Sequence, residues 1–134
     1  MAAPEVRHMK WWGWGHEDVS FSDADKPKLW PYLKRELGLE DGVRTLPVSF
    51  EEVTMPEPKQ NEAFLAAVKK ALADDQVSDG KKDRLVHAAG KAFRDLLRLR
   101  RGQVDYAPDV VLYPASEEDV VAIVKAAAEH DAVL

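Results

Sequence analysis

Three of the chain's four tryptophans fall within the four positions from Trp11 to Trp14, and glycines stand at positions 13 and 15. Each indole carries a large apolar area and one N–H group that needs a partner when it is buried. The glycines allow the backbone to bend or to approach another surface closely. We therefore expect residues 9–15, the tryptophan segment, to lie against a large surface, in this chain or in a partner protein.

Length and composition narrow the class of protein. At 134 residues the chain is long enough for one small domain. It has no cysteine, which excludes disulfides, thiolate zinc sites and cysteine nucleophiles. No apolar run approaches the roughly 20 residues that a membrane span requires, and the N-terminus lacks the apolar core of a signal peptide. These features predict a cytoplasmic protein without a transmembrane segment.

The net charge of −5 is unevenly distributed. Residues 80–102 hold eight basic and two acidic residues, so this basic segment carries +6 and the rest of the chain −11. An acidic chain with one basic segment is not expected to bind nucleic acid. The segment is interpreted either as a solvated helix face or as a site for a phosphorylated small molecule.

Apolar periodicity and capping residues predict three helices before residue 104. One ends at Leu37 before Gly38, one begins after Asn61, and one runs from Phe93 towards Gly102. Three further stretches are expected to lack regular structure: a proline-containing linker over 42–58, a polar turn over 74–80 and a turn or loop over 83–89.

The last thirty residues carry the strongest secondary-structure signal. Residues 109–113 lie between two prolines and predict a short buried strand. Ser116 begins a helix that ends near His130, and residues 131–134 start a new apolar run. The pattern predicts a βαβ unit that is cut in its second strand. The expected buried stripe of the helix is Val120, Ile123, Val124 and Ala127.

Three blocks of sequence resemble a known family: the tryptophan segment, residues 83–91 with 96–102, and residues 108–114. In this order they are similar to the alkyldihydroxyacetonephosphate synthases, which are FAD-linked oxidases with a vanillyl-alcohol-oxidase-type flavin domain. The resemblance implies an α+β fold, with a mostly helical region at 1–104 and the start of the FAD-binding domain at 105–134. The glycine-rich loop that holds the FAD pyrophosphate would follow the second strand, beyond Leu134.

The resemblance implies that the chain is the N-terminal part of a longer FAD-dependent enzyme and is inactive alone. Its partners would then be the remainder of the same chain and a small, phosphorylated substrate, and a homo-oligomer is left open. Pro114 and Ala115, at the strand-to-helix turn, are expected to contact the FAD. Arg84, His87 and Lys91 are expected to contact the substrate. No catalytic residue and no metal site is predicted.

Two alternatives stay open. The synthases have histidines where this chain has Ala89 and Lys91, so a related oxidase could instead transfer a hydride from a hydroxy acid or alcohol to the flavin. The synthases themselves exchange an acyl for an alkyl group on a phosphorylated three-carbon backbone. The second alternative is a free-standing helical module that binds a partner protein through the tryptophan segment.

Overall fold

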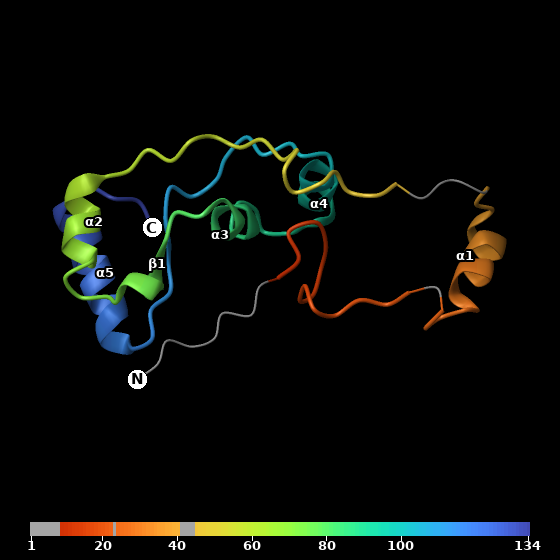
Figure 1. Cartoon of the computed structure of the whole chain (residues 1–134), viewed down its shortest axis with the longest axis horizontal. Coiled ribbons are helices and arrows are strands. Elements are labelled where there is room, and N and C mark those ends of the chain that lie inside the picture. The colour runs from red at the N-terminus through yellow and green to blue at the C-terminus, as the bar shows by residue number, and fades with distance from the viewer. Residues whose placement is uncertain (1–8, 23, 41–44) are drawn as a thin grey trace.

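The computed structural model describes residues 9–22, 24–40 and 45–134 (Figure 1). It combines short helices with a two-stranded sheet, in agreement with the predicted α+β class. The elements, in chain order, are α1 (Leu29–Leu37), α2 (Glu62–Val68), the 3₁₀ helix η1 (Asp74–Gln76), β1 (Val77–Ser78), α3 (Lys81–Val86), α4 (Phe93–Arg100), β2 (Val111–Leu112) and α5 (Glu117–Glu129).

Local chemistry explains where the predicted helices begin and end. The Asn61 side chain accepts a hydrogen bond from the Phe64 N–H at 3.0 Å and starts α2. Ser116 does the same for α5. Gly38 and Gly102 take left-handed backbone angles, with φ of 61° and 71°, just after α1 and α4. This conformation is cheap for glycine, so both stops follow from the sequence.

Two parts of the secondary structure differ from the prediction. Residues 81–86 form helix α3 where a turn or loop was expected, and residues 77–78 form strand β1 within the expected polar turn. Strand β2 pairs antiparallel with β1, with Val77 opposite Leu112 and Ser78 opposite Val111. Residues 131–134 form no strand here. The parallel partner predicted by the βαβ pattern is therefore not seen in this structure.

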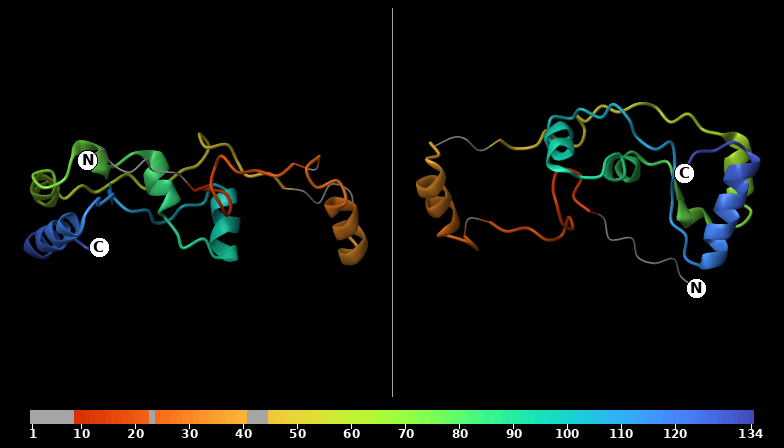
Figure 2. Two further views of the ribbon diagram at one scale, coloured as in Figure 1. Left: turned by 90° about the horizontal axis from the view of Figure 1, so that it is seen from below. Right: turned by 180° about the vertical axis from the view of Figure 1, so that it is seen from behind.

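The buried residues form two cores. The central core lies around α3 and α4 and contains Trp11, Val53, Leu85, Val86, Leu96, Leu99 and Val104. The end core lies where α2 and α5 pack together and contains Phe64, Val68, Leu72, Ile123, Ala126 and Ala127. Figures 1 and 2 show α2, α5 and β1 at one end of an elongated molecule, α3 and α4 in its middle, and α1 apart at the other end. None of the α1 residues is buried.

The predicted buried stripe of α5 was only half right. Ile123 and Ala127 are buried, but Val120 and Val124 are 45% and 51% exposed. The reason is that α5 meets α2 through the face that carries Ile123, Ala126 and Ala127. Val120 and Val124 therefore face away from the end core.

Helix α2 and strand β1 precede residue 104, yet both pack with β2 and α5. In this structure the end core thus draws on both sides of the expected boundary between 1–104 and 105–134. The boundary itself stays a prediction about the larger protein.

Candidate functional site

The tryptophan segment finds its surface within this chain. Trp11 is only 5% exposed and belongs to the central core, and the Trp12 ring lies edge-on to it at 5.6 Å. Trp14 is 63% exposed, but its indole N–H donates to the Lys91 carbonyl at 3.0 Å. The Lys91 ammonium group in turn donates to the Lys10 carbonyl at 2.6 Å. Lys91 thus joins the loop before α4 to both ends of the tryptophan segment.

Burial lowers the pKa of Lys91, and the nearby Glu17 carboxylate opposes this effect. Lys91 also has a positive φ of 59°, which is uncommon outside glycine. Its side chain is partly withdrawn from solvent and already committed to a backbone carbonyl. The predicted role of Lys91 as a substrate ligand therefore stays a prediction, alongside a structural role that the contacts display.

Several basic side chains of the basic segment hold extended parts of the chain in place. Arg84 is 4% exposed, and its guanidinium donates to the carbonyls of Pro56 and Pro108 at 2.7 Å each. Lys81 donates to the Phe50 carbonyl, and Lys82 pairs with Glu17 at 2.7 Å. Such charged donors satisfy carbonyls that extended backbone leaves without a ladder partner. Neither interpretation of the basic segment included this internal role.

His87 lies close to the sheet, at the end of α3. Its Nδ1 atom is 2.8 Å from the Asp83 carbonyl oxygen, and its ring lies edge-on to Tyr113 at 5.9 Å. A carbonyl can only accept a hydrogen bond, so Nδ1 carries the proton. The Tyr113 hydroxyl donates to the Asp83 carboxylate at 2.7 Å. Burial, together with this carboxylate, raises the pKa of Tyr113, which keeps the phenol protonated.

The turn that follows β2 is fixed by a buried glutamine. The side-chain amide of Gln76, a residue only 6% exposed, donates to the Tyr113 carbonyl at 2.9 Å and to the Asp119 carboxylate at 2.8 Å. The same carboxylate accepts the Ala115 N–H at 2.8 Å. The Gln76 hydrogen bond and then the Ala115 hydrogen bond lower the pKa of Asp119. Pro114 and Ala115 are thereby held in one geometry while both stay exposed.

An apolar cavity of about 430 Å³ lies beside this turn. It is lined by Phe64, His87, Pro108, Val110, Val111, Leu112, Pro114, Val120, Ile123, Val124, Val133 and Leu134. Of these lining residues, only His87 can carry a positive charge. The cavity therefore fits an apolar or aromatic group such as a flavin ring, whereas it offers no lysine or arginine to a pyrophosphate.

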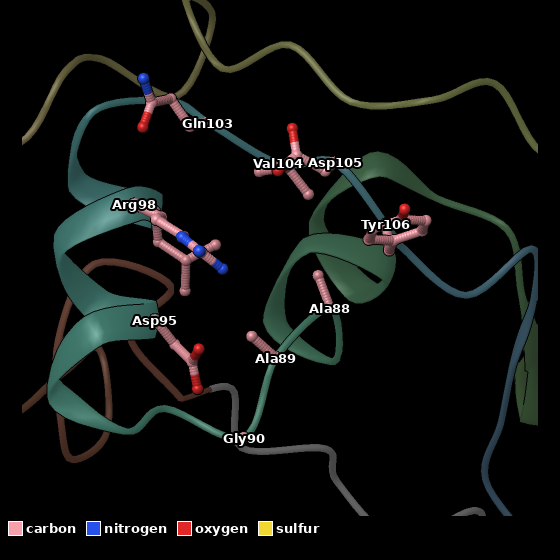
Figure 3. Close-up of a pocket in the computed structure, with 10 residues that line it drawn as sticks. Ala88, Ala89, Gly90, Asp95, Arg98, Gln103, Val104, Asp105 and Tyr106 are labelled. Carbon is pink, nitrogen blue, oxygen red and sulfur yellow. The ribbon is translucent and has the colours of Figure 1, made fainter.

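A second cavity of about 260 Å³ lies between the end of α3, helix α4 and the chain after α4 (Figure 3). Asp95 and Arg98 reach it from α4, and Ala88, Ala89 and Gly90 form the opposite wall. Ala89 is one of the two positions at which the resemblance places a histidine in the synthases. The cavity combines opposite charges and is open, so it indicates no particular ligand.

The predicted substrate residues do not converge on one point. Arg84 reaches towards Pro56 and Pro108, and Lys91 reaches towards Lys10, while His87 lines the apolar cavity beside Pro114. The sequence argument missed Gln76, because an isolated glutamine in a polar stretch gives no local signal.

Two further features concern the described part of the chain as a whole. Within it, no cluster of three or more histidine, aspartate or glutamate side chains is arranged to hold a metal ion. None of its helices has both the length and the apolar character needed to cross a membrane.

Comparison with known proteins places the chain. It is 32% identical to the alkyldihydroxyacetonephosphate synthase of Dictyostelium discoideum, over 96% of this chain and 25% of that protein. It is 36% identical to the synthase of Trypanosoma brucei brucei, over 60% of this chain and 13% of that protein. A shorter relative, Protein Rv2250A of Mycobacterium tuberculosis, is 30% identical, over 79% of this chain and 69% of that protein. No family model matches the chain.

Solved structures agree with the sequence comparison. Two structures of alkyldihydroxyacetonephosphate synthase match the chain with TM-scores of 0.80 and 0.78, at 29% and 30% identity. They cover 95% and 92% of this chain, which spans only 28% and 26% of theirs. The resemblance inferred from the three sequence blocks is therefore confirmed by fold and by sequence. The chain is an alkyldihydroxyacetonephosphate-synthase-like segment that matches about a quarter of such a synthase.

Proposed function

We propose that the chain serves as the N-terminal part of an FAD-dependent enzyme of the alkyldihydroxyacetonephosphate synthase type. The observation that carries this proposal is the match to a solved synthase over 95% of the chain, with a TM-score of 0.80. The chain supplies the first strand and helix of the flavin domain, β2 and α5. In the larger protein the predicted second strand would complete a βαβ unit beside β2.

The residues around the turn after β2 give this segment a defined part in the enzyme. Pro114 and Ala115 lie at the carboxyl end of a strand, where α/β units collect their ligands. Gln76 and Asp119 hold the turn, and the apolar cavity next to it accepts a flat aromatic group. We propose that this turn and cavity contact the flavin, which supplies the redox chemistry when bound. The pyrophosphate must be held by residues that this segment does not contain.

His87 is the predicted substrate residue that fits this picture best. With the proton on Nδ1, the neutral ring keeps Nε2 as a hydrogen-bond acceptor. The ring lines the cavity beside the turn, so a ligand there can meet it. We propose a small phosphorylated substrate for the complete enzyme, and a cytoplasmic location remains a prediction.

The interaction-module alternative is less well supported. A module that binds a partner through the tryptophan segment needs its indoles accessible, whereas Trp11 is 5% exposed and Trp12 packs on it. Trp14 is exposed, but its N–H is already hydrogen bonded within the chain. The segment acts as an internal seal.

A chimera tests the proposed function. The matching quarter of the Dictyostelium synthase is replaced by this chain, and the purified chimera is assayed for bound FAD and for exchange of an acyl for an alkyl group. Stoichiometric FAD with exchange activity supports the proposal. A colourless, folded chimera contradicts it. Flavin loading with oxidation of an alcohol or hydroxy acid, and no exchange, favours the oxidase alternative.

A further inference from the structure

Helix α5 has a second apolar face that this chain leaves uncovered. Val120 and Val124 are 45% and 51% exposed, and Val133 and Leu134 beside them are 98% and 71% exposed. Together with Pro114 they line the apolar cavity described above. We call these five residues the α5 apolar face. Single exposed apolar residues are ordinary, but a contiguous apolar surface around a cavity marks a place where something binds.

The strand next to this face is also incompletely paired. Strand β2 pairs with β1 in a sheet of two strands, so in the described chain its other edge has no strand beside it. An open edge offers free backbone N–H and carbonyl groups to another strand. An apolar helix face next to an open strand edge is what the adjoining layer of an α/β domain covers.

The comparisons indicate what covers this face. In the solved synthases the same fold is part of a chain of which this segment makes up 28%. The remaining part of such a synthase is called the synthase body here. The Mycobacterium tuberculosis relative shows that this segment also occurs in a much shorter protein, because the chain covers 69% of that protein but only 25% of the Dictyostelium synthase. A segment of this kind can thus be encoded apart from a full-length synthase.

We propose that the α5 apolar face is the docking surface for a synthase body present as a separate polypeptide, so that the flavin enzyme is assembled from two chains. This inference rests on the proposed function. The docked body places a strand along the open edge of β2 and apolar side chains against Val120 and Val124. It thereby closes the cavity beside Pro114 and completes the flavin site with the pyrophosphate ligands that this segment does not contain.

Co-expression tests the proposal. This chain, with an affinity tag, is produced together with the Dictyostelium synthase body, and the purified material is analysed for body per tagged chain and for FAD. We expect equimolar recovery and bound flavin. Val124→Asp should reduce the recovered body at least about tenfold, because docking would bury an unpaired carboxylate. Val121→Asp is the matched control, since Val121 is on the same helix and 46% exposed but does not line the cavity.

Recovery within about twofold of the parent is expected for the control, as for most surface substitutions. Equal loss with both variants would mean that the α5 apolar face is not the docking surface. If the covalent chimera binds FAD but the separate chains do not associate, assembly from two chains is wrong while the proposed function stands. If the chimera itself binds no FAD, the proposed function fails. A homodimer that Val124→Asp dissociates, without recovery of the body, would identify a second copy as the occupant.

Discussion

Arg84 provides the sharpest test of how this small protein is held together. The residue is 4% exposed, and its Nε and a terminal nitrogen each donate to a proline carbonyl at 2.7 Å. Those carbonyls, of Pro56 and Pro108, belong to two extended stretches that are distant in the sequence. A hydrogen bond from a charged donor contributes about 1.5–3 kcal/mol, and truncation leaves a buried carbonyl without its partner. Because both bonds share one side chain, the losses add incompletely, and Arg84→Ala should cost about 3 kcal/mol.

The assay is urea unfolding followed by circular dichroism, with Arg84→Lys and Arg98→Ala alongside. Lysine keeps the charge but replaces the planar fork by a single nitrogen, so Arg84→Lys should recover only part of the loss. Arg98 is exposed in the last turn of α4, where a cation contributes at most about 1 kcal/mol through the helix dipole. If Arg84→Ala and Arg98→Ala unfold at the same urea concentration, the structural role assigned to Arg84 is wrong.

Three further predictions follow from burial, charge and the limits of this segment. Ile123→Asp should lower the unfolding free energy by more than about 3 kcal/mol, since Ile123 is buried against α2, while Val124→Asp should cost under about 1 kcal/mol; similar melting temperatures for the two would refute the orientation of α5. The pKa of Asp119 is lowered below its ordinary value of 3.8, so its stabilisation is present above that pH and is lost as the pH falls through the folded-state pKa; Asp119→Asn should therefore melt lower than the parent at pH 7 and show a smaller drop in melting temperature upon acidification, and an unchanged drop would contradict this. The isolated chain should bind no FAD in equilibrium dialysis, because a pyrophosphate needs a cluster of donors that the cavity does not offer; a yellow protein with stoichiometric flavin would overturn this.

Much of the local structure could be predicted from the sequence, because it depends on residues only a few positions apart. Asn61 and Ser116 cap helices through hydrogen bonds to residues three positions on, and Gly38 and Gly102 stop helices through their own backbone freedom. The blocks that revealed the family are likewise contiguous. Burial of the tryptophan segment was anticipated, although the sequence did not say against what.

The candidate site depended on contacts that no local pattern encodes. Gln76 meets Tyr113 and Asp119, 37 and 43 positions away, and Arg84 meets carbonyls 28 and 24 positions away. A glutamine or an arginine in a polar stretch looks the same whether it is solvated or buried, since only the folded chain decides which carbonyl lies within reach. This is why the basic segment was interpreted as a solvated face or a phosphate site.

The sequence by itself determined which segments become helices, where most of them end, and to which family the chain is similar, because capping and periodicity act over one or two helical turns. Only the tertiary structure decided which side of α5 is buried. Val120, Ile123, Val124 and Ala127 form one continuous apolar stripe, and helical periodicity cannot divide it between two neighbours. Packing against α2 takes the part with Ile123 and Ala127 and leaves Val120 and Val124 exposed beside the turn after β2.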